Sequence, residues 1–115
     1  MKKYFVLPEV SFAPADIESF IDEVTFGIHY KSIHEKLRRQ LEELVGEDED
    51  NLNQDLIEFQ EVAGFQDPEM RHAAGGHFNH AFFWHCISKK KGSEPSGKLK
   101  EAIERDFTDF ETLKE

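Results

Sequence analysis

Apolar residues recur at helical spacing over one long stretch near the start of the chain, from about Asp22 to Val45. The positions are Ile21, Phe26, Ile28, Ile33, Leu37, Leu41, Leu44 and Val45. Side chains three and four residues apart share one face of an α-helix, so we expect a long amphipathic helix that ends at Gly46. Its apolar face needs a helix of similar length to cover it, which predicts an antiparallel helical hairpin.

Further helices are predicted from start and stop signals along the chain. The second runs over about 52–63 and ends at a glycine. The third covers about 67–88, because its Asp-Pro-Glu start supplies a capping residue, a first-turn proline and a favourable charge. A loop at 92–97 leads to a short amphipathic helix at 98–107, whose apolar face is Leu99, Ala102, Ile103 and Phe107, and 109–115 begins another turn.

The first residues read as an extended arm, because Pro8 and Pro14 forbid a continuous helix there. Alternating apolar side chains, Tyr4, Val6, Val10 and Phe12, would tuck against the helices. The expected fold class is therefore all-α: an antiparallel long helical hairpin with an extended N-terminal arm and short C-terminal helices. Its seam would be lined by Ile28, Ile33, Leu37 and the phenylalanines.

Charge and cysteine content exclude several classes of function. The formal net charge is -10, with 24 acidic against 14 basic residues, which disfavours nucleic acid or an anionic membrane as partner. No apolar stretch is long enough to span a membrane, so direct membrane insertion is not expected. The single cysteine, Cys86, cannot form an internal disulfide; it fits an intracellular, reducing compartment and reads as a small core residue.

The segment Met70–Trp84 combines a double glycine, two histidines one turn apart and a run of aromatic residues. At about 100° per residue, five neighbours fall within roughly 60° of His80. They are Ala73, Gly76, His77, Phe83 and Trp84. A face that is small, polar and aromatic at once looks shaped around a bound group.

Histidine is the commonest metal ligand, and His29 on the first helix would point towards the same seam as His80. Two histidines from facing helices could hold two corners of a metal site. The alternative is that each is an ordinary histidine with one hydrogen bond. His34 is predicted to be exposed, and His72 and His85 to point away from His80; a lone Glu69-x-x-His72 pair is too little for a di-iron site.

The motif Gly-Gly-His-x-Asn-His-x-x-Phe-Trp at 75–84 resembles the iron/manganese superoxide dismutases, and Thr25–Tyr30 is similar to that family's first ligand segment. The resemblance implies that His29 and His80 are two metal ligands, with Gly76, His77, Phe83 and Trp84 around them. It also implies a helical hairpin domain over 1–91, followed by a linker and the start of a C-terminal region at 92–115.

The chain departs from the family's pattern at the positions that complete the site. The resemblance implies two further ligands, an Asp and a His from a C-terminal α/β domain, and their Asp-x-Trp-Glu-His pattern is absent from these 115 residues. Ile33 stands where the family has an active-site histidine, and Leu37 where it has a gateway tyrosine. Neither can donate or accept a proton. Gly76 stands where iron-type members often carry a glutamine.

We therefore expect no catalytic residues and no cofactor in the isolated chain. The first hypothesis is a structural subunit of a larger protein assembly. The second is half of a split dismutase that holds iron or manganese once a partner chain supplies the missing domain. A third is a metal-binding module that uses His29, His77 and His80 with a dimer mate. The expected location is the mitochondrial matrix or the cytoplasm.

Overall fold

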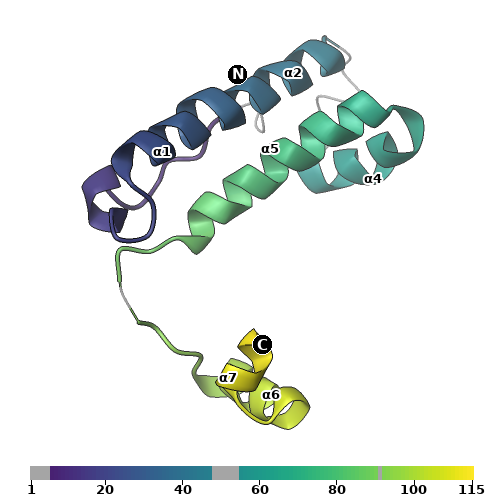
Figure 1. Ribbon diagram of the computed structural model, residues 1–115. Coiled ribbons are helices and arrows are strands. Elements are labelled where there is room, and N and C mark those ends of the chain that lie inside the picture. The colour runs from purple at the N-terminus through teal and green to yellow at the C-terminus, as the bar shows by residue number, and fades with distance from the viewer. Residues whose placement is uncertain (1–5, 48–54, 91) are drawn as a thin grey trace.

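The computed structural model describes residues 6–47, 55–90 and 92–115, and its described part consists of helices and connecting segments without a strand (Figure 1). The all-α prediction is confirmed. The elements are η1 (Pro14–Ile17), α1 (Glu23–Gly27), η2 (Ile28–His34), α2 (Glu35–Val45), α4 (Leu56–Gln66), α5 (Pro68–Cys86), α6 (Gly97–Phe107) and α7 (Phe110–Lys114). No described helix has the length and apolar character needed to cross a membrane.

The long first helix exists as predicted, but its middle is wound differently from its ends. Asp22 caps it by accepting hydrogen bonds from the backbone N–H of Thr25 at 2.9 Å and from its hydroxyl at 2.7 Å. Between α1 and α2 lies η2, a seven-residue π-helical segment. The long first helix ends at Gly46, whose φ of +60° suits a residue without a Cβ. The acidic residues that follow Gly46 lie partly outside the described part of the chain.

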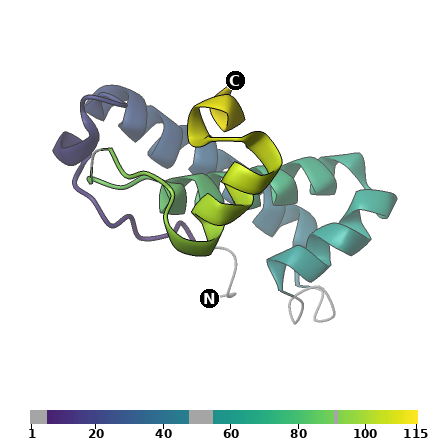
Figure 2. The ribbon, with the colours of Figure 1, turned by 90° about the horizontal axis from the view of Figure 1, so that it is seen from below.

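The hairpin is formed by α2 and α5, with α4 lying along α5 at the end farthest from the arm (Figures 1 and 2). Its buried core is Leu41, Val45, Phe59, Ala73 and Ala74. The predicted stop at Gly64 was wrong, because α4 continues to Gln66. Asp67 caps α5 as expected, since its carboxylate accepts from the backbone N–H of Glu69 at 2.9 Å. The helix ends at Cys86, slightly before the predicted residue.

A second cluster closes the other end of the hairpin, where the N-terminal arm packs across it. It consists of Phe12, Ile17, Phe26, Trp84 and Ile87. The arm runs irregularly to the 3-10 turn η1, and Phe12 is buried as the alternation predicted. Val6 is exposed, and Tyr4 lies outside the described residues.

Three expectations about the core were wrong. Ile28 is 52% exposed and Ile33 39% exposed, so neither lines the seam. Both residues lie in η2, whose π-helical winding departs from the 100° per residue on which the expectation rested. Cys86 is exposed rather than buried, because in the last turn of α5 it is Trp84 that faces the arm.

The short C-terminal helices α6 and α7 pack on each other and are set apart from the hairpin by an extended segment (Figure 1). Ile103 is buried, while Leu99 and Phe107 are exposed, so only part of the predicted apolar face of α6 is covered. The division into domains at 91/92 stays a prediction.

Candidate metal half-site

Two of the histidines singled out in the sequence lie side by side, one from η2 and one from α5. The ring centroids of His29 and His80 are 5.9 Å apart and the ring planes are inclined by 27°. Together with Asn79 and Phe83 they line a cavity of about 170 Å³ that opens to the surface. The tertiary structure therefore brings together the two residues expected to be ligands, with Phe83 beside them.

His80 is held in one orientation by its own helix. Its Nδ1 lies 2.7 Å from the carbonyl oxygen of Gly76, one turn earlier. A carbonyl oxygen only accepts, so Nδ1 carries the proton and the lone pair of the neutral ring is on Nε2. Metal-binding histidines commonly donate their second N–H to a backbone carbonyl in this way. The ring of His80 is thus prepared to offer Nε2 to an ion.

The separation of the two rings fits a shared ion. A metal–nitrogen bond of about 2.1 Å places the ion roughly 3.2 Å from each ring centroid, so two ligand rings can be up to about 6.4 Å apart. The 5.9 Å between His29 and His80 lies within that limit. Within the described residues, however, no group of three or more His, Cys, Asp or Glu is placed to hold a metal. The described residues thus supply two candidate ligands of a metal site, not a complete set.

A second pair of histidines is buried behind the half-site and joined to a tryptophan. The indole N–H of Trp84 donates to Nδ1 of His34 at 3.0 Å. Tryptophan can only donate, so the proton of neutral His34 is on Nε2, which donates to Nδ1 of His77 at 2.8 Å. His34 is 0% and His77 2% exposed. The chain of donors thus runs in one direction, from Trp84 through His34 to His77.

The prediction that His34 is exposed was wrong, and the reason is the π-helical winding of η2. A π turn closes on residue i+5, so His34 is turned towards α5, where its ring meets those of His77 and His80. One signal could have indicated this. The dipeptide Ile-His occurs at 28–29 and again at 33–34, five residues later.

Burial sets the protonation of His34, the member of this pair that contacts Trp84. It lowers the pKa of His34 to about 4, and the neighbouring imidazoles of His77 and His80 add to the effect. His34 is therefore neutral at physiological pH. Because His77 is buried and its Nδ1 accepts from His34, it is poorly placed to bind an ion shared with a dimer mate.

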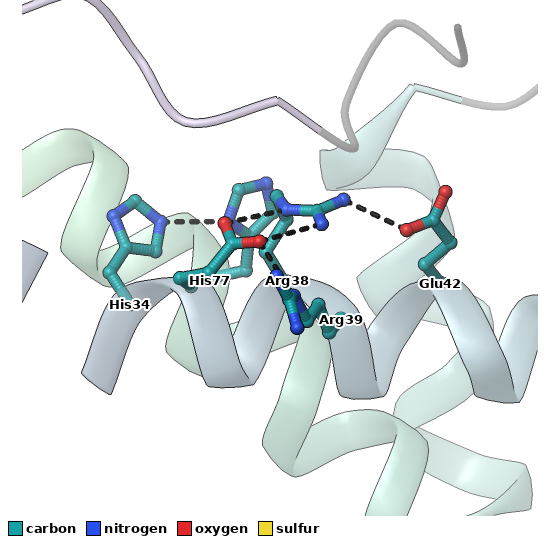
Figure 3. Close-up of polar contacts among 6 residues, drawn as sticks. His34, Arg38, Arg39, Glu42 and His77 are labelled. Atoms are coloured by element: carbon teal, nitrogen blue, oxygen red, sulfur yellow. Dashed lines mark hydrogen bonds and ion pairs between the residues drawn. The ribbon is translucent and has the colours of Figure 1, made fainter. Parts of the chain in front are cut away.

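Next to the inner histidines, α2 carries an ion-pair network formed by Glu35, Arg38, Arg39 and Glu42 (Figure 3). Arg38 donates to both carboxylate oxygens of Glu35 at 2.9 Å and to Glu42 at 2.9 Å, and Arg39 donates to Glu35 at 2.8 Å. The hydrogen bonds from Arg38 are the main reason that the pKa of Glu35 falls to about 2. Glu35 in turn raises the pKa of Arg38.

A recess of about 550 Å³ lies on the other side of His80, between α2 and α5. Its lining residues are Ser32, Ile33, Lys36, Leu37, Gln40, His72, Gly76 and His80. Leu37 packs against Gly76 so closely that an added Cβ there would be 2.9 Å from two Leu37 carbons. Ile33 and Leu37 therefore contribute apolar side chains to the recess beside His80.

The remaining histidines lie outside the half-site. His72 and His85 are both exposed, although His72 also lines the recess. Glu69 is exposed, so the Glu69–His72 pair stands on the surface of α5.

Comparison with known proteins identifies relatives of the hairpin. The family described as iron/manganese superoxide dismutases, alpha-hairpin domain, matches residues 4–88. Similar curated proteins include superoxide dismutase [Fe] of Coxiella burnetii, 28% identical over 110 residues, which cover 96% of this chain and 55% of that protein. Superoxide dismutase [Mn/Fe] of Rickettsia conorii is 31% identical over 108 residues, 93% and 52% of the two chains. Superoxide dismutase [Mn] of Listeria innocua is 32% identical over 117 residues, 96% and 57%. The chain spans about half the length of the curated relatives it matches.

Proposed function

The chain belongs to the iron/manganese superoxide dismutase family, and we propose that its 115 residues serve as a structural hairpin that does not catalyse dismutation by itself. The observation that carries the proposal is that Ile33 and Leu37 line the recess beside His80, at the positions where we expect the family's proton-carrying groups. Forming peroxide from superoxide requires protons at the site. Ile33 and Leu37 line the recess and can neither donate nor accept one.

The exposed apolar side chains beside the half-site indicate where such a hairpin would dock. Ile28, Ile33 and Phe83 are all exposed, and Phe83 lines the cavity of His29 and His80. Exposed apolar side chains around the half-site are the kind of surface that a protein partner covers. We propose that the partner is an α/β domain, on another subunit of a larger assembly or on a continuation of this chain.

Activity and metal content of the purified chain test this proposal together. After expression with iron or manganese, we expect no dismutation above the buffer control and far less than one equivalent of metal by elemental analysis. The double variant Ile33→His with Leu37→Tyr introduces proton-carrying groups beside His80, and it should also remain inactive, because the chain still lacks the ligands of a complete metal site. Near-stoichiometric iron or manganese with activity in the lone wild-type chain would overturn the proposal.

A second candidate function is half of a metal centre that a partner completes. The hydrogen bond between Nδ1 of His80 and Gly76 favours it, because it leaves Nε2 for an ion beside His29. An iron or manganese ion bound there would supply one-electron redox chemistry. His29 and His80 would then occupy two of the coordination positions of the ion, and Phe83 and Trp84 would keep water away from it.

Reconstitution distinguishes the two candidates. The chain is mixed with the C-terminal half of one of its bacterial relatives, and the metal content of the complex is measured. A half-site predicts metal that is lost in His29→Ala and in His80→Ala and kept in His72→Ala, a control on the same helix as His80. A complex that forms without metal supports the structural role alone. The compartment, mitochondrial matrix or cytoplasm, stays a prediction.

A further inference from the structure

We propose that His34 is a positioning residue for the half-site, and that it acts through its hydrogen bond with Trp84. The inference rests on the second proposed function, in which His29 and His80 are ligands. It assigns a role to a buried histidine that touches neither the open cavity nor the recess.

The evidence is that each ligand ring rests on one member of the His34–Trp84 pair. The His34 ring lies 5.4 Å from that of His80, with the planes inclined by 30°. The Trp84 ring lies 6.4 Å from that of His29, nearly perpendicular at 74°. A single buried hydrogen bond of 3.0 Å joins the two supporting rings. A shift of either support would therefore move one candidate ligand relative to the other.

The hydrogen bonds of His34 hold its ring in one orientation. Nδ1 accepts from Trp84 and Nε2 donates to His77, so both nitrogens are engaged. Turning the ring over would break both bonds at a site without solvent exposure, where lost bonds are not replaced by water. His34 thus offers His80 a rigid surface on one side, while Gly76 holds its Nδ1 on the other.

This arrangement also keeps His34 from acting as a ligand itself. Its lone pair on Nδ1 is occupied by the indole N–H, and its other nitrogen carries the proton donated to His77. An ion near the cluster therefore meets two available imidazoles, those of His29 and His80. Mutating a residue that holds a metal ligand in place commonly weakens metal binding 10–100-fold.

The test compares His34→Ala, His34→Gln and Trp84→Phe with wild type and with His85→Ala, a control at an exposed histidine of α5. The ¹⁵N shifts of the His80 ring report its tautomer, and Zn²⁺ titration followed at His29 and His80 reports affinity. His34→Ala and Trp84→Phe should give mixed His80 tautomers and at least about tenfold weaker Zn²⁺ binding. His34→Gln should stay near wild type, because an amide can accept from the indole and donate to His77.

Unchanged His80 tautomer and Zn²⁺ affinity in folded His34→Ala and Trp84→Phe would overturn the proposal, since His34 would then be a core residue only. Circular dichroism checks the fold of each variant, and loss of the fold in all three would also overturn it. If wild type takes up no Zn²⁺, the half-site proposal fails. The His80 tautomer still decides the positioning role in that case.

Discussion

The side chain of Leu37 lies directly on the backbone of Gly76. A Cβ built on Gly76 would be 2.9 Å from both terminal carbons of Leu37, closer than van der Waals contact permits. This is a close approach of α2 to α5 beside His80, and it depends on residue 76 having no side chain. Leu37 and Gly76, two positions where the sequence analysis expected departures from the family's pattern, are therefore in direct contact.

The first prediction follows from this contact. Gly76→Ala should leave the hairpin about 1–3 kcal/mol less stable than Gly75→Ala, because both gain helix propensity but only at position 76 does overpacking force Leu37 or the helix to move. Gly75→Ala is the matched control, since its Cβ would meet only the side chain of Gln60 at an ordinary 3.7 Å. It should be neutral or stabilise by up to about 1 kcal/mol through helix propensity. Urea unfolding of both variants measures the difference, and equal effects would contradict the prediction.

The second prediction concerns pH. The pKa of His34 is about 4 in the folded chain and near 6.5 when unfolded, so between these values the unfolded state binds more protons. Stability is complete above about pH 6.5 and is lost as the pH falls towards 4. The expected loss between pH 7 and pH 5 is roughly 2 kcal/mol. Urea unfolding at both pH values measures it. His34→Gln removes the titrating group, so an equally large loss in that variant would refute the assignment.

The third prediction concerns the ion-pair network of Glu35, Arg38, Arg39 and Glu42 on α2. Hydrogen bonds from Arg38 lower the pKa of Glu35 to about 2, so the carboxylate stabilises the fold above about pH 4.5 and loses that effect as the pH falls towards 2. Glu35→Gln should cost roughly 1 kcal/mol at pH 7. Glu104→Gln, which breaks an exposed pair with Lys100, should cost less, because solvent screens that pair. Thermal unfolding of both variants tests whether this order holds.

The fourth prediction concerns the N-terminal arm. The hydroxyl of Tyr30 donates to the carbonyl oxygen of Pro8 at 2.7 Å, and burial raises the pKa of Tyr30, so the bond persists at neutral and mildly basic pH. Tyr30→Phe should cost about 1 kcal/mol and release the arm. Limited proteolysis should then cleave the arm faster, while cleavage in the 92–97 segment stays at the wild-type rate. Equal acceleration at both places would instead indicate general unfolding.

Much of the helical fold was predictable because its signals are local. The periodicity of Asp22–Val45 and the Asp-Pro-Glu start of α5 specify helices through neighbouring residues alone. The placement of His29 beside His80 also followed from the hairpin. What escaped prediction was the side of the helix on which Ile28, Ile33 and His34 lie. An angle of 100° per residue assumes α-helical winding, and η2 does not have it.

The sequence by itself determined that this chain is an all-α hairpin of the superoxide dismutase family, because helix periodicity, caps and a specific motif are read from neighbouring residues. Only the tertiary structure decided that His34 joins Trp84 and His77 in the core, and that Leu37 closes over Gly76. These contacts join residues about 40 to 50 positions apart. They depend on the π-helical segment η2, and they form only when α5 packs against it.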